Sequence, residues 1–298
     1  MTASTITLDP PAKVNLYLAV RGRRPDGYHT LETLFERLDL ADELRLTRRP
    51  SGLTLTCSDP AVPTDDRNLV LRAARLFFQA AGVAGGVEAA LVKRIPVAGG
   101  LGGGSSDAAS TLLGLNTLYD APLTRAQLMT LGGQLGADVP FFVSEHVVAW
   151  GRGRGDEIVP AQPPRRPLWH VLVNPGLPVL TQEVYAQFDR LPPAALTPSA
   201  ADGTLLARLV QAGDPGPVAG CLANALEPAI EASYPAIRAL KAALSSAGAR
   251  GVLVSGSGPT TYGLADDEVH ARAIAARLRR DRPDWTTHVA RTALPVPA

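Results

Sequence analysis

A glycine-rich segment, PVAGGLGGGSSDAAS from Pro96 to Ser110, is the part of this chain that most clearly suggests a chemistry. Glycine has no Cβ, so a run of glycines can lie close to a ligand with its N–H groups pointing inward. A helix that begins where such a loop ends adds unpaired N–H groups and the positive end of its dipole. The segment therefore predicts a phosphate-binding site.

The residues that flank the glycines predict a strand before the loop and a helix after it. The strand side alternates apolar residues at Val87, Ala89, Leu91 and Ile95. The helix side has an apolar stripe at Ala108, Ala109, Leu112, Leu113 and Leu115, with Ser105 or Ser106 as the expected N-cap. A flexible linker is the alternative interpretation, but linkers are rarely framed by a strand and a capped apolar helix.

The loop matches none of the commonest phosphate motifs. No register of its glycines gives the spacing of the dinucleotide fingerprint, and the chain contains no Gly-Lys pair for a P-loop of the Walker type. The protein-kinase signatures HRD and DFG are also absent from the sequence. These observations exclude three frequent classes of nucleotide-binding protein.

The composition is that of a globular protein without a nucleic-acid partner. Among 298 residues, 29 are basic and 28 acidic, and no basic block stands out. The cluster Arg21, Arg23 and Arg24 is either a local anion patch or a solvated loop. Two cysteines exclude a disulfide framework and argue against a thiolate metal site. Neither a signal peptide nor a membrane span is visible, so we expect a cytoplasmic protein without membrane partners.

Hydrophobic patterning predicts an α+β fold with two domains. Strands are expected at 12–20, 44–46, 53–56, 169–173, 251–254 and 288–291, and helices at 68–81, 230–247 and 270–279. Thr124 and Gln127 predict a capping box for a further helix that ends near Gly136. Three prolines between 161 and 167 mark the expected boundary, which gives domains 1–162 and 163–298. The elements lack a regular βαβ rhythm, which argues against a doubly wound sheet.

Four separated segments resemble the GHMP kinases, the superfamily of galactokinase, homoserine kinase and mevalonate kinase. They are PAKVNLYL with DGYHTLET, then PVAGGLGGGSSDAA, GADVPFF and SGSGPTTYG. The resemblance implies an N-terminal domain related to a ribosomal-protein fold and a C-terminal ferredoxin-like domain. The active site would lie in the cleft between the two domains.

The first segment is most similar to the branch of the superfamily that phosphorylates a cytidine-diphosphate-linked methylerythritol in the non-mevalonate isoprenoid pathway. The resemblance implies transfer of a phosphoryl group from ATP, with Mg²⁺, to the 2-hydroxyl of that sugar alcohol. Two alternatives stay open: a kinase for homoserine or mevalonate, and a nucleotide-binding regulator without catalysis. The oligomeric state and the metal ligands are not predicted.

The resemblance also implies the catalytic and ATP-binding residues. Asp138 would take the proton from the substrate hydroxyl, and Lys13 would orient Asp138 and stabilise the incipient alkoxide. A position between a helix end and Val-Pro-Phe-Phe would partly desolvate this aspartate and raise its basicity. The ATP phosphates would be held by Pro96, Val97, Ala98, Gly99, Gly100, Leu101, Gly102, Gly103, Gly104, Ser105 and Ser106. A structural ion pair between Lys13 and Asp138 is the alternative.

Substrate recognition is implied for a third group of residues: Asn15, Tyr28, His29, Thr181, Tyr185, Gly256 and Gly258. Tyr28 and Tyr185 would stack on opposite faces of the cytosine, and His29 would supply a hydrogen bond. The sequence departs from the family pattern at three places, one of them Tyr185, where the family often has Phe. Thr181 lies in Leu-Thr-Gln where the family usually has Pro-Thr-Pro, and Asp107 replaces a frequent Asn.

Overall fold

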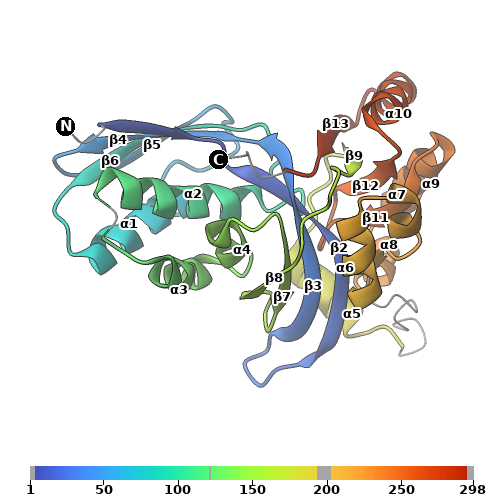
Figure 1. Cartoon of the computed structure of the whole chain (residues 1–298), viewed down its shortest axis with the longest axis horizontal. Coiled ribbons are helices and arrows are strands. Elements are labelled where there is room, and N and C mark those ends of the chain that lie inside the picture. The colour runs from blue at the N-terminus through green and yellow to red at the C-terminus, as the bar shows by residue number, and fades with distance from the viewer. Residues whose placement is uncertain (1–3, 121, 193–202, 294–298) are drawn as a thin grey trace.

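The computed structural model describes residues 4–120, 122–192 and 203–293, and it places their strands in three sheets (Figure 1). No helix among these residues is long and apolar enough to cross a membrane. The α+β class predicted from the sequence is confirmed.

The first sheet carries the helix that follows the glycine loop. Its strand order is β1 (Thr5–Leu8), β4 (Glu43–Arg49), β6 (Gly86–Val92) and β5 (Leu53–Cys57). Its core is shared with α1 (Leu69–Ala81), α2 (Gly103–Leu118), α3 (Arg125–Leu135) and α4 (Val139–Ser144). The helix α2 lies between this sheet and the other helices, and residues from Ser106 to Leu112 are buried without interruption. Burial on all sides replaces the one-sided stripe that the sequence predicts.

The second sheet holds the long strand β2 (Pro11–Arg23). Its order is β10 (Ala223–Asn224), β2, β3 (His29–Ala41), β7 (Val148–Arg152) and β8 (Glu157–Pro160). Packing on both sides buries the polar face of β2 together with its apolar face, so Lys13 is 3% exposed and Asn15 is 2% exposed. The short strand β10 pairs in parallel with β2, although it lies far along the chain.

The third sheet has the order β11 (Arg250–Val254), β12 (Thr261–Ala265), β9 (Trp169–Asn174) and β13 (Thr286–Arg291). With α9 (Ala236–Ser246) and α10 (Glu268–Asp281) packed on it, this arrangement is ferredoxin-like. The remaining helices are α5 (Thr181–Phe188), α6 (Gly203–Ala212), α7 (Pro215–Ala219) and α8 (Glu227–Ser233). The predicted helix over 230–247 is wrong as one unit, because Pro235 separates α8 from α9.

Local sequence signals predicted both ends of α1 and of α3 correctly. Asn68 caps α1, Gly82 ends it in the left-handed conformation, and Thr124 and Gln127 form the expected capping box of α3. The predicted serine N-cap of α2 is wrong. That helix begins earlier, since Gly102 occupies the N-cap with φ 72° and the carbonyl of Gly102 accepts from the Ser106 N–H at 2.9 Å. Both serines therefore lie in the first turn.

Candidate active site

Three motifs that are distant in sequence meet at the glycine loop. The backbone N–H of Lys13 donates to the Leu101 carbonyl at 2.9 Å, which ties the loop to β2. The Ser255 hydroxyl donates to the Gly100 carbonyl at 3.0 Å, and the Thr260 N–H donates to the Gly99 carbonyl at 3.2 Å. The loop is thus clamped between the second and third sheets.

Glycine is required where these segments touch. A Cβ on Gly100, whose φ is 75°, would lie 2.4 Å from the Ser255 carbonyl oxygen. A Cβ on Gly256 would lie 3.2 Å from Asn15 Oδ1 and 3.5 Å from Lys13 Nζ. Close approach of two backbones therefore explains Gly100, whereas a left-handed φ of 58° and the adjacent Asn15 and Lys13 side chains explain Gly256.

Lys13 and Asp138 form an ion pair at the end of the glycine loop. Lys13 Nζ lies 3.5 Å from Asp138 Oδ2 and donates to Asn15 Oδ1 at 2.7 Å. The Lys13 side chain is 4% exposed, whereas that of Asp138 is 32% exposed. Solutes can reach the Asp138 carboxylate, and the buried Lys13 ammonium holds it in place. Such a carboxylate is suited to accept a proton from a hydroxyl group.

A hydrogen-bond chain holds Lys13 in this position. Asn15 Nδ2 donates to Thr33 Oγ1 at 2.7 Å, and that hydroxyl donates to the Tyr17 carbonyl at 2.6 Å. The Tyr262 hydroxyl, from the third sheet, donates to the Asn15 carbonyl at 3.0 Å. Asn15 therefore orients the ammonium through a side chain whose amide oxygen and nitrogen both make hydrogen bonds.

A large cleft of about 920 Å³ collects every sequence-predicted catalytic and substrate residue. These are Lys13, Asn15, Tyr28, His29, Asp138, Thr181, Tyr185, Gly256 and Gly258. A small groove of about 340 Å³ lies along the glycine loop and is lined by 61–63, 67–69, 96–100, 102–105, Lys93 and Asp107. Ala98, Gly100 and Gly102 line both spaces, so the loop separates them. Leu101 is buried and Ser106 is fully covered, so neither lines the groove.

The aromatic residues of the large cleft are arranged differently from the predicted sandwich. His29, not Tyr28, stacks on Tyr185, with ring centroids 4.9 Å apart. His29 Nε2 also lies 2.7 Å from Oδ1 of Asp189, which follows the last residue of α5. Tyr28 is 58% exposed and lies beside Arg154. A base that stacks on Tyr185 has to displace His29 or use the other face of the ring. Burial, reinforced by the charge of Asp138, raises the pKa of the Tyr185 phenol.

Two residues were not predicted from the sequence: Ser257, which lines the cleft, and Asn224, which supports the turn beside it. Asn224 of β10 donates to the Val254 and Gly256 carbonyls at 2.9 and 2.7 Å, which fixes the glycine turn. Ser257 Oγ lies 2.8 Å from Thr181 Oγ1. Ser257 lies within the SGSGP motif and could have been inferred from it, whereas nothing in the sequence marks Asn224.

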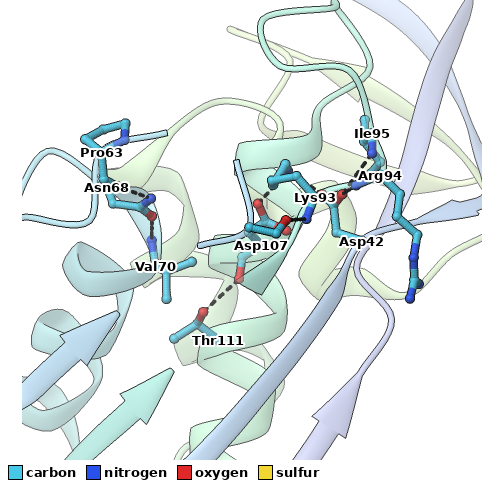
Figure 2. Close-up of polar contacts among 10 residues, drawn as sticks. Asp42, Pro63, Asn68, Val70, Lys93, Arg94, Ile95, Asp107 and Thr111 are labelled. Atoms are coloured by element: carbon cyan, nitrogen blue, oxygen red, sulfur yellow. Dashed lines mark hydrogen bonds and ion pairs between the residues drawn. The ribbon is translucent and has the colours of Figure 1, made fainter. Parts of the chain in front are cut away.

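The small groove is supported by polar contacts at two places (Figure 2). Asn68 Oδ1 accepts from the Val70 N–H at 2.9 Å and its Nδ2 donates to the Pro63 carbonyl at 2.7 Å, so the cap of α1 also holds the groove wall. At the loop itself, Lys93 pairs with Asp107 at 2.9 Å. Burial raises the pKa of Asp107 to about 7, although Lys93 opposes the shift.

Solved structures first show the fold. The fold resembles homoserine kinase from Cytophaga hutchinsonii, with a TM-score of 0.69 and 19% identity over 99% of this chain and 96% of that one. It also resembles mevalonate kinase from L. major, with a TM-score of 0.74 and 16% identity over 99% and 100%. The family models for the GHMP kinases N terminal domain and the GHMP kinases C terminal match residues 68–146 and 206–284.

Proteins with higher sequence identity show which branch of the GHMP kinases the chain belongs to. A crystal structure of 4-(cytidine 5'-diphospho)-2C-methyl-D-erythritol kinase is 39% identical, with a TM-score of 0.82 over 96% of this chain and 98% of that one. The 4-diphosphocytidyl-2-C-methyl-D-erythritol kinase of Pelotomaculum thermopropionicum is 44% identical over 92% of this chain and 94% of the relative. That of Geobacter metallireducens is 43% identical over 94% and 96%. The chain therefore belongs to the GHMP kinases and, among them, to the 4-diphosphocytidyl-2-C-methyl-D-erythritol kinase family.

Proposed function

We propose that this protein phosphorylates the 2-hydroxyl of 4-diphosphocytidyl-2-C-methyl-D-erythritol with ATP, in the non-mevalonate isoprenoid pathway. Relatives of that name match nearly the whole chain at about 40% identity. The observation that carries the proposal is the Lys13–Asp138 pair, 3.5 Å apart, at the junction of the glycine loop and the large cleft. The domain boundary at 162/163 and the cytoplasmic location stay predictions.

The proposed chemistry uses Asp138 as the base. The acceptor hydroxyl loses its proton to the Asp138 carboxylate while its oxygen forms a bond to the γ-phosphorus of ATP. The bond from that phosphorus to the bridging oxygen breaks, and ADP leaves with the electron pair. Lys13 holds the carboxylate and stabilises negative charge on the attacking oxygen, and Asn15 fixes the ammonium through the 2.7 Å hydrogen bond.

The glycine loop holds the nucleotide side of the reaction. Its backbone N–H groups and the start of α2 would contact the phosphates of ATP, which enters as its Mg²⁺ complex. The described residues contain no group of three or more His, Cys, Asp or Glu side chains arranged for a metal ion. A divalent ion carried mainly by phosphate oxygens and water is compatible with that inventory, and we assign no residue to it.

The acceptor side is the large cleft. Its aromatic and histidine side chains, Tyr28, His29 and Tyr185, would recognise the cytidine, and Thr181 with the Gly256–Gly258 turn would meet the diphosphate. Thr181 and Ser257 are already paired at 2.8 Å, which gives that wall two hydroxyl groups.

A coupled assay that measures ADP release with a panel of alcohols tests the proposal. We expect turnover with 4-diphosphocytidyl-2-C-methyl-D-erythritol and none with homoserine or mevalonate. Turnover of homoserine or of mevalonate in preference to the cytidine compound would favour another GHMP kinase. Binding of ATP without turnover on any alcohol would favour a regulator.

A further inference from the structure

A buried cluster of three charged side chains, Asp42, Lys93 and Asp107, lies beside the small groove (Figure 2). They come from three different places: the turn between β3 and β4, the residue after β6, and the first turns of α2. Lys93 pairs with both carboxylates, and the exposed fractions of the side chains are 0% for Asp42, 7% for Lys93 and 4% for Asp107. Charges buried this deeply cost free energy unless they are well compensated, which calls for a functional reason.

Both carboxylate oxygens of Asp42 accept hydrogen bonds, which offset the cost of burying its charge. Oδ2 accepts from Lys93 Nζ, while Oδ1 accepts from the backbone N–H groups of Arg94 and Ile95 at 2.6 and 2.8 Å. These two amides directly precede Pro96, where the glycine loop starts. One buried carboxylate therefore fixes both a cation and the backbone that leads into the loop.

The Lys93 ammonium reaches the first turn of α2. A Cβ on Gly103 would lie 3.2 Å from Lys93 Nζ, and Lys93 lines the small groove beside that glycine. An ammonium has three N–H donors. Asp42 and Asp107 use two of them, and no third acceptor is found among residues 4–120, 122–192 and 203–293. One donor is thus left beside the N–H groups of the loop.

The other carboxylate has a spare oxygen. Asp107 Oδ2 accepts from Lys93 at 2.9 Å, whereas its buried Oδ1 has no hydrogen-bond partner in the described part of the chain. The two carboxylates therefore do not contribute equally. Asp42 makes three hydrogen bonds and is completely buried, so it is the residue that decides where the ammonium lies.

We propose that Asp42 is a positioning residue for the polyphosphate of the nucleotide: it holds Lys93 so that the remaining N–H of the ammonium points to the phosphates in the small groove. This inference rests on the proposed function, because it takes ATP to be the ligand of the groove. The Lys93 ammonium would supply the cation that the glycine loop lacks in its own sequence, since no Gly-Lys pair follows the glycines.

Binding measurements on the intact chain separate this role from a structural one. Calorimetry with ADP and with adenosine, without acceptor, compares the wild-type protein with Asp42→Asn, Lys93→Met and the double variant. We expect ADP to bind at least about tenfold more weakly to each single variant, as for a lost hydrogen bond to a charged group, with adenosine affinity unchanged. The double variant should bind ADP no more weakly than Lys93→Met, because both changes remove one interaction.

A matched control is available in the C-terminal domain. Glu227 resembles Asp42 because it accepts from the Val254 N–H at 2.9 Å and pairs with Lys241 at 2.9 Å. Glu227→Gln should lower the melting temperature without changing the ratio of ADP to adenosine affinity. A loss of ADP affinity in this control as large as in Asp42→Asn would overturn the assignment, because any disturbed ion pair would then have the same effect.

Two further outcomes contradict the inference. Unchanged ADP affinity in a folded Asp42→Asn variant removes the role of Asp42 and leaves the kinase proposal intact. If that variant does not fold, unchanged ADP affinity in Lys93→Met removes the role of the cluster. A wild-type protein that binds neither ATP nor ADP would instead refute the kinase proposal, and this inference with it.

Discussion

The small groove and the large cleft share the glycine loop but differ in their lining: glycine-rich backbone in the groove and mainly side chains in the cleft. The groove is lined largely by the glycine loop, and buried, hydrogen-bonded residues such as Asp42 and Asn68 hold the backbone next to it. The cleft presents side chains from both halves of the chain, among them Tyr28, Tyr185 and Thr181. Backbone recognises a phosphate whatever group is attached to it, while side chains can distinguish one acceptor from another. From this comparison we expect that changes in the groove alter ATP binding and that changes in the cleft alter acceptor choice.

The Lys13–Asp138 pair lies where the two regions meet, so a change there should stop the reaction without disturbing either region. Asp138→Asn keeps the size of the side chain but removes the basic carboxylate. We expect kcat to fall roughly 10²–10⁴-fold, the usual contribution of general acid–base catalysis, with ATP affinity nearly unchanged. Steady-state kinetics check this. A variant with more than about a third of wild-type turnover would exclude Asp138 as a base of that strength.

On the groove side, Gly100→Ala should separate the loop from the turn that clamps it. Its Cβ would collide with the Ser255 and Gly258 carbonyls, at 2.4 and 2.8 Å. We expect kcat/KM for ATP to fall roughly 10²-fold, since a displacement of about 1 Å at a reacting site can cost that much. Gly133→Ala in α3 is the control, because its Cβ meets only Pro140 Cγ at 4.0 Å. Equal ATP kinetics in the two variants would contradict the clamp.

On the cleft side, Tyr185→Ala should weaken binding of the acceptor and leave ATP unaffected. Loss of one stacking surface costs roughly 1–3 kcal/mol, so the acceptor KM should rise roughly 5- to 150-fold. Tyr185→Phe retains the ring and should retain most of the affinity. A parallel rise in the KM of ATP would show that the two regions are not separable at this residue.

A separate prediction concerns stability rather than activity, at Asp107 beside the groove. The folded-state pKa of Asp107 is raised to about 7 by burial, so the folded protein binds this proton more tightly than the unfolded chain does. Stability from this group is complete at low pH and is lost as pH rises toward 7, by up to about 1.4 kcal/mol per pH unit. Asp107→Asn lacks the titrating group. Urea unfolding from pH 5 to 8 should show a steeper decline for wild type, and parallel curves would disprove the shift.

The sequence predicted which residues line the cleft and how the groove's backbone turns, but not how the side chains of the cleft pair with one another, for a physical reason. Glycines, caps and turn residues act on their own backbone, so the loop, the cap of α1 at Asn68 and the capping box at Thr124 can be read locally. The stack of His29 on Tyr185 depends on β3 and α5, which are far apart in sequence. The same holds for Asn224, which reaches the glycine turn because β10 joins the second sheet. The buried pair of Asp42 and Lys93 is likewise set by tertiary packing.

The central claim is that the large cleft selects a cytidine-linked acceptor, and removal of the cytidine tests it most directly. The measurement compares kcat/KM for 4-diphosphocytidyl-2-C-methyl-D-erythritol with that for methylerythritol 4-phosphate, at saturating ATP. The proposed contacts of Tyr185 and His29 with the base predict at least about a tenfold loss, the equivalent of one lost hydrogen bond or stacking contact. Equal efficiency with both compounds would contradict the claim.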